Sequence, residues 1–293
     1  MVSSGFFIGV DGGGTGCRAR LYDADGAPLA QGAGGPANIR LGLPAAWTAI
    51  MEAVDMALGR AGLDRSALPS IRAGLGLAGI VTEVDRDRVV ASAPAFAETQ
   101  AASDAHTACL GAFSGRDGGI VIAGTGSAGH AVIGGRGIGI GGWGFEVSDD
   151  GSGAWIGRES VRAALHAHDG LIPASAFTRQ VLDQLGGGPD IVVGWAGRAT
   201  PGDYARFAPA ALAAAAEGDP VAARIVASAG EALSALCRRL LELGAPKVCL
   251  MGGLAVPLRP WLPAGLLPSL TEPEGDAMDG AMLLARVAAG AAP

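Results

Sequence analysis

The chain has 293 residues, about twice the length of a typical domain, which predicts two domains with sizeable cores. Apolar residues make up 49% of the chain and charged residues only 17%, which excludes an intrinsically disordered protein. The formal net charge of −7 opposes binding to nucleic acid or to an anionic membrane, so neither partner is expected.

The first third of the chain alternates strand and helix patterns. Three short β-type runs separated by glycine-rich and Asp-Gly turns predict an antiparallel meander. Helices and further strands follow, as expected of a mixed sheet covered by helices. The predicted order is strands over 6–10, 18–22 and 29–34, a helix over 47–58, a strand over 71–77, a helix over 81–91, a strand over 98–103 and a helix over 104–113.

The opening pattern returns after the polar segment 114–118, which is the predicted domain boundary. The repeat suggests two halves built on one plan. The clearest later helix begins with Asp219 as N-cap and Pro220 at its first position, and ends before Gly244. The elements predicted in this half are strands over 120–123, 128–133 and 137–140, helices from 152 onward, a strand over 247–251 and a last helix over 276–289.

The chain contains a single lysine, Lys247, in the segment 245–248. Walker A loops, protein kinases and PLP enzymes each need a lysine in a setting that this segment does not supply, so all three classes are excluded. The four cysteines are scattered without a C-x-x-C pair, which suggests neither a zinc site nor a disulfide framework. Residues 1–5 lack the basic start and apolar core of a signal peptide, so we expect a cytoplasmic protein.

Two glycine-rich hairpins are the strongest chemical signal: Asp11-Gly12-Gly13-Gly14-Thr15-Gly16 and Gly124-Thr125-Gly126-Ser127. Each offers backbone N–H groups without side-chain obstruction, together with hydroxyls, which suits the oxygens of a polyphosphate when no lysine is available. Asp11 ends an apolar strand, where it can position a metal. The alternative is that both are ordinary turns. The 49 glycines of the chain are accordingly attributed to tight turns and to close approach of the backbone to a ligand.

A dinucleotide site is a weaker interpretation of the second hairpin. Gly124, Gly126 and Gly129 match G-x-G-x-x-G after a strand. A dinucleotide fold needs a helix directly after these glycines, whereas residues 128–135 have the pattern of a strand and a turn. We therefore favour a hairpin that binds phosphate.

Three motifs resemble the sugar kinase, Hsp70 and actin (ASKHA) superfamily. They are the phosphate-1 motif at 8–15, the phosphate-2 motif at 123–127 and the adenosine motif at 251–254, which contains Gly252 and Gly253. Five further segments are similar to the N-acetylglucosamine and glucosamine kinases of the BadF/BadG/BcrA/BcrD ATPase group, namely 35–38, 103–105, 141–144, 148–152 and 275–281. The resemblance covers nearly the whole chain in the expected order.

The resemblance implies an α/β fold of two ribonuclease H-like (actin-like ATPase) domains with a cleft between them. Residues 1–114 would carry the sugar-binding part and receive the C-terminal helix over 276–290, and residues 115–293 would carry the nucleotide-binding part. ATP and Mg²⁺ are the implied cofactors, with Asp11 at the metal. The implied nucleotide-binding residues are Asp11, Gly12, Gly13, Gly14, Thr15, Gly124, Thr125, Gly126, Ser127, Gly252 and Gly253.

The resemblance also implies that Asp104 accepts the proton of the sugar 6-hydroxyl. Its position at a predicted strand-to-helix junction suits a general base, although an aspartate there also suits a helix cap. The implied sugar-binding residues are Asn38, Gly79, Asp104, Gly142, Trp143, Gly144 and Asp149. The alternative interpretation of Trp143 is a core aromatic residue, and that of Asp149 is a residue in a solvated turn.

One departure from the family pattern bears on which amino sugar is the substrate. Eukaryotic N-acetylglucosamine kinases have Leu-Ser-Gly where this chain has Leu77-Ala78-Gly79, so one hydrogen bond to the sugar is missing and the choice between N-acetylglucosamine and glucosamine stays open.

The expected activity is an ATP-dependent amino-sugar kinase. Two alternatives remain: an activator ATPase with an iron–sulfur cluster shared by two subunits, and a non-catalytic sugar sensor. Since similar proteins are often homodimers, a homodimer is also an expectation.

Overall fold

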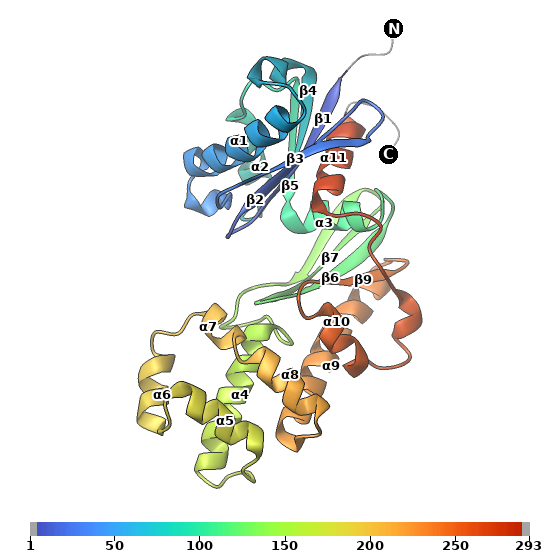
Figure 1. Ribbon diagram of the computed structural model, residues 1–293. Helices are drawn as coiled ribbons and strands as arrows, with labels where there is room; N and C mark the ends of the chain where they lie inside the picture. The colour runs from blue at the N-terminus through green and yellow to red at the C-terminus, as the bar shows by residue number, and fades with distance from the viewer. Residues whose placement is uncertain (1–4, 289–293) are drawn as a thin grey trace. The chain divides into compact units, whose positions relative to one another are not determined.

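The computed structural model describes residues 5–288, which form two compact units (Figure 1). Within the described residues, the first unit comprises 5–118, Ala131–Gly137 and 272–288, and the second comprises Gly119–His130 and Ile138–Thr271. Each contains a five-stranded sheet, with strand orders β3-β2-β1-β4-β5 and β8-β7-β6-β9-β10. The two orders are equivalent, which confirms that both halves share one plan.

The first unit follows the predicted element order. β1 pairs antiparallel with β2, and β2 with β3, whereas β1 pairs parallel with β4, and β4 with β5. The elements are β1 (Phe6–Gly12), β2 (Cys17–Tyr22), β3 (Pro28–Gly34), α1 (Leu43–Arg60), β4 (Ile71–Leu77), α2 (Glu83–Ala91), β5 (Glu98–Ser103), α3 (Asp104–Ala112) and α11 (Ala277–Ala288), with short 3-10 helices at Ile39–Leu41 and Arg65–Ser70.

Helices cover both faces of the first sheet, with α1 and α11 on opposite sides (Figure 1). Side chains of β1 alternate between the two faces. Ile8 and Val10 belong to the main core, which also contains Val54 of α1, whereas Phe7 packs in a smaller cluster with Met282 of α11. The C-terminal helix α11 therefore completes the core of the unit in which the chain begins.

Glycines allow these helices to approach the sheet closely. A Cβ added at Gly9 or Gly74 would lie less than 3.0 Å from the backbone of α11, and one at Gly32 or Gly34 would do the same with α1. Real Cβ atoms essentially never approach other atoms so closely. Part of the glycine excess therefore serves helix–sheet packing, a use that the sequence interpretation in terms of turns and ligand binding missed.

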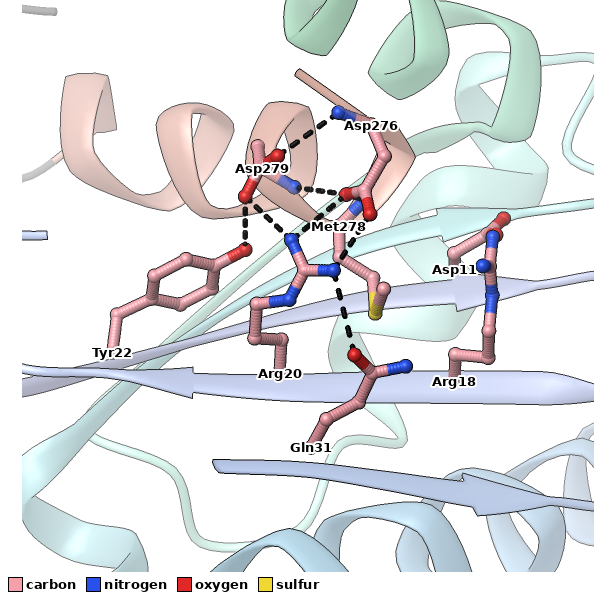
Figure 2. A network of polar contacts seen from close by, with 8 residues as sticks. All are labelled: Asp11, Arg18, Arg20, Tyr22, Gln31, Asp276, Met278 and Asp279. Atoms are coloured by element: carbon pink, nitrogen blue, oxygen red, sulfur yellow. Dashed lines mark hydrogen bonds and ion pairs between the residues drawn. The ribbon is translucent and has the colours of Figure 1, made fainter. Parts of the chain in front are cut away.

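A polar network fixes the start of α11 to β2 (Figure 2). Arg20 donates from Nη2 to Oδ2 of Asp276 at 2.7 Å and from Nη1 to Oδ1 of Asp279 at 2.8 Å. Tyr22 donates its hydroxyl to the same Oδ1 of Asp279 at 2.7 Å. Because the Arg20 side chain is only 19% exposed, these ion pairs are partly shielded from water.

The second unit carries most of the remaining elements. The elements are β6 (Gly118–Ala123), β7 (Ser127–Ile133), β8 (Arg136–Gly141), α4 (Gly153–His168), α5 (Ala176–Leu185), α6 (Pro189–Ala196), α7 (Pro201–Ala205), α8 (Ala208–Ala216), α9 (Pro220–Glu242), β9 (Val248–Met251), α10 (Ala255–Leu258) and β10 (Leu270–Thr271), with 3-10 helices at Arg259–Trp261 and Leu267–Ser269.

The longest helix, α9, begins as predicted. The Asp219 carboxylate accepts hydrogen bonds from the backbone N–H groups of Val221 and Ala222, and Pro220 occupies the first helical position. Within residues 5–288, α9 is the one helix long and apolar enough to span a membrane, but half of the apolar stretch is buried in the protein, as in a core helix.

The division into units differs from the single boundary after residue 114. The Asp117 carboxylate accepts two hydrogen bonds from the Gly134 N–H, at 2.9 and 3.0 Å, so the turn between β7 and β8 groups with the first unit. Glu274 forms an ion pair with Arg116 and accepts a hydrogen bond from the Ser114 hydroxyl at 2.7 Å. Side-chain contacts thus bring two later segments back to the first unit.

Candidate active site

Three parallel strands of the first unit end together. Gly12 of β1 is the register partner of Leu77 in β4, and Leu77 is the partner of Ser103 in β5. The residues that follow these positions therefore lie along one edge of the sheet: the glycine hairpin, the Ala78-Gly79 segment and Asp104. Ligands of open α/β sheets bind outside the carboxyl ends of the strands, so this edge is the candidate site.

Backbone hydrogen bonds join the first hairpin to the segments predicted to bind sugar. Ala78 N–H donates to the Gly12 carbonyl at 2.8 Å, and Ala37 N–H donates to the Gly13 carbonyl at 3.0 Å. The Asn38 side chain accepts from Arg40 N–H at 2.9 Å and caps the following 3-10 helix. A Cβ on Gly79 would lie 2.6 Å from the Asn38 Oδ1. The structure thus brings Asn38 and Gly79 into contact beside the hairpin.

The tip of this hairpin is open. Gly13 N–H donates to the Gly16 carbonyl at 2.9 Å, which closes the turn. Gly14 and Thr15 are exposed, and an added Cβ on Gly14 would meet no atom within 4 Å. The tip therefore has room for an oxyanion next to unobstructed backbone amides.

Asp11 has a partner that the sequence analysis missed. Arg18 of β2 lies opposite Asp11 in the antiparallel register, and its Nη2 donates to the Asp11 Oδ2 at 2.6 Å. The signal in the sequence was an arginine seven residues after the aspartate, across a tight hairpin. The Asp11 carboxylate, which was predicted to bind a metal ion, therefore forms an ion pair with Arg18.

Asp104 is the first residue of α3 but not its cap. The Ser103 hydroxyl accepts the N–H of His106 at 3.2 Å and caps the helix, which removes plain helix capping as an explanation of Asp104. The Asp104 Oδ1 accepts from Ala105 N–H at 2.9 Å. Burial, and next the negative charge of Asp11, raise the pKa of the Asp104 carboxyl, which makes it a stronger base than a surface aspartate.

The second hairpin lies at the end of β6 in the other unit. Its Gly124 and Thr125 carbonyls accept hydrogen bonds from Gly153 and Ala154 at 2.8 and 3.1 Å, where α4 begins. Leu254 N–H donates to the Ala123 carbonyl at 3.0 Å, so the Gly252-Gly253 segment lies beside this hairpin, as the adenosine motif implies.

The two hydroxyl side chains of this hairpin, Thr125 and Ser127, differ in their exposure to solvent. Thr125 is exposed at the tip, whereas Ser127 is 5% exposed and its hydroxyl donates to the Asp150 carbonyl at 2.8 Å. The Ser127 hydroxyl therefore holds the segment after the Gly142–Gly144 loop, and Thr125 is the hydroxyl that faces solvent.

Asp149 joins the second hairpin to the loop containing Trp143. It accepts from Gly144 N–H at 3.4 Å, and a Cβ on Gly126 would lie 2.6 Å from its Oδ2. Its φ of 63° is unusual for a non-glycine residue. Burial, and next the charges of Asp150 and Glu146, raise the pKa of Asp149, so it differs from a solvated turn residue.

Trp143 is 75% exposed, which excludes the alternative of a core aromatic. An exposed indole beside two glycines with positive φ, Gly142 and Gly144, offers a flat apolar surface to a ligand.

The part of the chain that the structure describes contains no group of three or more His, Cys, Asp or Glu side chains that could hold a metal ion. Asp11 alone still fits Mg²⁺, which is commonly bound by one or two carboxylates together with substrate phosphates.

All four cysteines are buried, and none forms a disulfide. Burial raises the pKa of Cys17 and Cys237 to about 12 and that of Cys109 to about 11, which disfavours the thiolates that an iron–sulfur cluster requires.

Residues 8–259 match the BadF/BadG/BcrA/BcrD ATPase family. The chain belongs to this family. A curated relative, glucosamine kinase GspK of Vibrio cholerae, is 35% identical over 96% of this chain and 95% of its own length. The match to the BadF/BadG/BcrA/BcrD ATPase family includes both hairpins, Asp104 and Asp149.

Solved structures agree with this assignment. A protein from Chromobacterium violaceum, provisionally named an N-acetylglucosamine kinase, is 40% identical with a TM-score of 0.86, covering 97% of this chain and 99% of that one. A ROK family glucokinase from Streptomyces griseus, solved with glucose and AMPPNP, is 20% identical with a TM-score of 0.55, covering 97% and 100%. The second likeness concerns the fold alone and confirms the predicted actin-like ATPase architecture.

Proposed function

We propose that this member of the BadF/BadG/BcrA/BcrD ATPase family is an ATP-dependent amino-sugar kinase. The observation that carries the proposal is the relation to glucosamine kinase GspK, which extends over nearly the full length of both chains. The edge of the first sheet supports it, since a glycine hairpin and a carboxyl with a raised pKa lie there together. Glucosamine and N-acetylglucosamine are both candidate substrates, because one relative is a glucosamine kinase at 35% identity and another, at 40% identity, is provisionally named an N-acetylglucosamine kinase.

The chemical step assigned to this site is phosphoryl transfer to the sugar 6-hydroxyl. Asp104 accepts the hydroxyl proton while O6 forms a bond to the γ-phosphorus of ATP, and the bond from that phosphorus to the bridging oxygen breaks to release ADP. A positioned base of this kind contributes about 10²–10⁴-fold in rate. The amides of the two hairpins stabilise charge on the phosphate oxygens.

Asp11 is the residue that would hold Mg²⁺. When bound, the ion neutralises charge on the ATP phosphates. The nucleotide is assigned to the amides of Gly12–Thr15 and Gly124–Ser127 and to the Gly252-Gly253 segment.

The residues assigned to the sugar are Asn38, Gly79, the Gly142–Gly144 loop and Asp149. The exposed indole of Trp143 suits the apolar face of a sugar ring. A cytoplasmic location and a homodimeric state complete the proposal.

An assay of ADP release across glucose, glucosamine, N-acetylglucosamine and N-acetylmannosamine tests the substrate class. We expect turnover with at least one amino sugar at a kcat/KM above that for glucose, and ³¹P–¹H correlation of the product to place phosphate on O6. A chain that used glucose best would contradict the amino-sugar assignment.

Asp104→Asn tests the base. We expect kcat to fall by about 10²–10⁴-fold while ADP binding is retained. Asp64→Asn is the matched control, because Asp64 is exposed, caps a 3-10 helix of the same unit, and asparagine caps equally well. An Asp104→Asn variant with half of the wild-type kcat would contradict the assignment.

The same preparation separates the alternatives. Sugar binding without ADP formation would favour a sensor. Iron content and a visible absorption band in anaerobically purified protein would favour an activator ATPase, which the buried, protonated cysteines do not support.

A further inference from the structure

A cavity of about 300 Å³ opens between α4 and α9, two helices that pack against each other in the second unit (Figure 1). Its volume is at the lower end of the range of small-molecule sites, about 300–1,000 Å³. One face of α4 lines it, because the lining residues of this helix recur every three or four positions. They include Trp155, Glu159, Arg162 and His166, and α9 adds Arg224 and Ile225.

The cavity carries positive charge that the protein does not neutralise. The Arg224 side chain makes no hydrogen bond or ion pair with the described residues, and the same is true of the His166 side chain. Arg162 lies 3.7 Å from Glu159, which also pairs with Arg158 at 3.3 Å. Glu159 is thus shared between two arginines. An excess of positive charge therefore lines one cavity of a chain whose net charge is −7.

The lining suits a ligand that combines a phosphate with a ring. A guanidinium binds phosphate oxygens in a bidentate manner, and a protonated imidazole adds a further donor. The partly exposed indole of Trp155 provides a flat apolar surface beside these cations, and Ile225 extends it. An inorganic anion would use the cations alone, whereas a sugar phosphate would use both parts of the lining.

This cavity is separate from the candidate active site. The residues that line it all belong to α4 and α9. The residues assigned to the nucleotide lie in the two hairpins and the Gly252-Gly253 segment, and those assigned to the sugar lie in other loops. A ligand held between α4 and α9 therefore occupies a second site.

We propose that the cavity between α4 and α9 binds a sugar phosphate, with the phosphate on Arg162, His166 and Arg224 and the ring on Trp155. The choice of a sugar phosphate among ring-bearing phosphates rests on the proposed function, because an amino-sugar kinase releases one as its product. The protein thus holds the product class of its own reaction outside the site that forms it.

Isothermal titration calorimetry with glucosamine 6-phosphate tests this site. Saturating glucosamine without ATP fills the proposed sugar site, so the heat reports the second site. We expect Arg224→Ala to weaken the affinity for glucosamine 6-phosphate by about 10- to 100-fold, because hydrogen bonds to a charged group are lost. We expect wild-type protein to bind inorganic phosphate more weakly than glucosamine 6-phosphate, since phosphate alone makes no contact with the indole.

Arg179→Ala is the matched control. Arg179 is an exposed arginine of α5 in the same unit, and its side chain has no polar partner within residues 5–288. The substitution removes the same charge outside the cavity, so the affinity for glucosamine 6-phosphate should stay at the wild-type value. Equal melting temperatures would show that both variants fold.

Three results would overturn the inference and leave the kinase proposal standing. They are wild-type affinity of Arg224→Ala for glucosamine 6-phosphate, equal affinities of wild-type protein for inorganic phosphate and glucosamine 6-phosphate, and displacement of glucosamine 6-phosphate by ADP, which would assign the cavity to the nucleotide. Conversely, binding that depends on Arg224 in a protein that releases no ADP with any amino sugar would support the second site and remove the proposed function.

Discussion

Replacing Gly74 by alanine tests the packing of α11 on the first sheet. Gly74 is buried in β4, and an added Cβ would lie less than 3.0 Å from the Ala281 carbonyl group in α11. The obstructing atoms belong to the backbone, so strand and helix must separate. Overpacking a core costs about 1–3 kcal/mol, and because the neighbouring backbone is rigid we expect the Gly74→Ala variant to lose about 3 kcal/mol of stability. At about 2–4 °C per kcal/mol, the melting temperature of the first unit falls by about 6–12 °C.

Differential scanning calorimetry of the whole chain measures this shift. Gly59→Ala is the matched control, because Gly59 is exposed in the last turn of α1 and an added Cβ would meet no atom within 4 Å. Helix propensity predicts a gain of about 0.5–1 kcal/mol for this control. If Gly74→Ala melted within 1 °C of the wild type, the close helix–sheet contact would be refuted.

Two further predictions concern pH. Burial raises the pKa of Asp279, but the hydrogen bonds from Asp276, Tyr22 and Arg20 outweigh burial and leave the pKa lowered. The ionised Asp279 carboxylate therefore stabilises the fold fully above the ordinary aspartate pKa, and this stabilisation is lost as pH falls through the lowered value. Arg20→Met should therefore unfold in acid at a higher pH than the wild type, and identical circular dichroism titrations would contradict this. For Asp104, whose pKa is raised, kcat/KM should fall as pH decreases through a value above the ordinary aspartate pKa. A rate profile that is flat down to pH 4 would show that this carboxyl is not the base.

Local patterns were enough to predict the order of elements. The N-cap Asp219, the strand that ends at Ser103 and the meander before α1 follow from turn residues and side-chain periodicity, which act over a few positions. The two hairpins could be recognised because glycines without side chains mark phosphate sites. Whether they bind nucleotide remains a prediction.

Contacts between distant segments could not be predicted in the same way. Arg20 and Asp276 are 256 residues apart, and no local pattern pairs them. Gly74 lies inside a strand, and the sequence alone does not show whether such a glycine merely weakens the strand or allows a helix to pack closely against it. The partner of Asp11 depended on the hairpin register, since a shift by one residue would have turned Arg18 to the other face.

The docking of α11 has a consequence for synthesis on the ribosome. Domains generally fold as units while the chain is being made. Here the face of the first sheet that contains Gly9 and Gly74 is covered by residues 277–288, which are translated after the whole second unit. The second unit can therefore complete its fold first, and this face of the first sheet is covered only after residues 277–288 have been made.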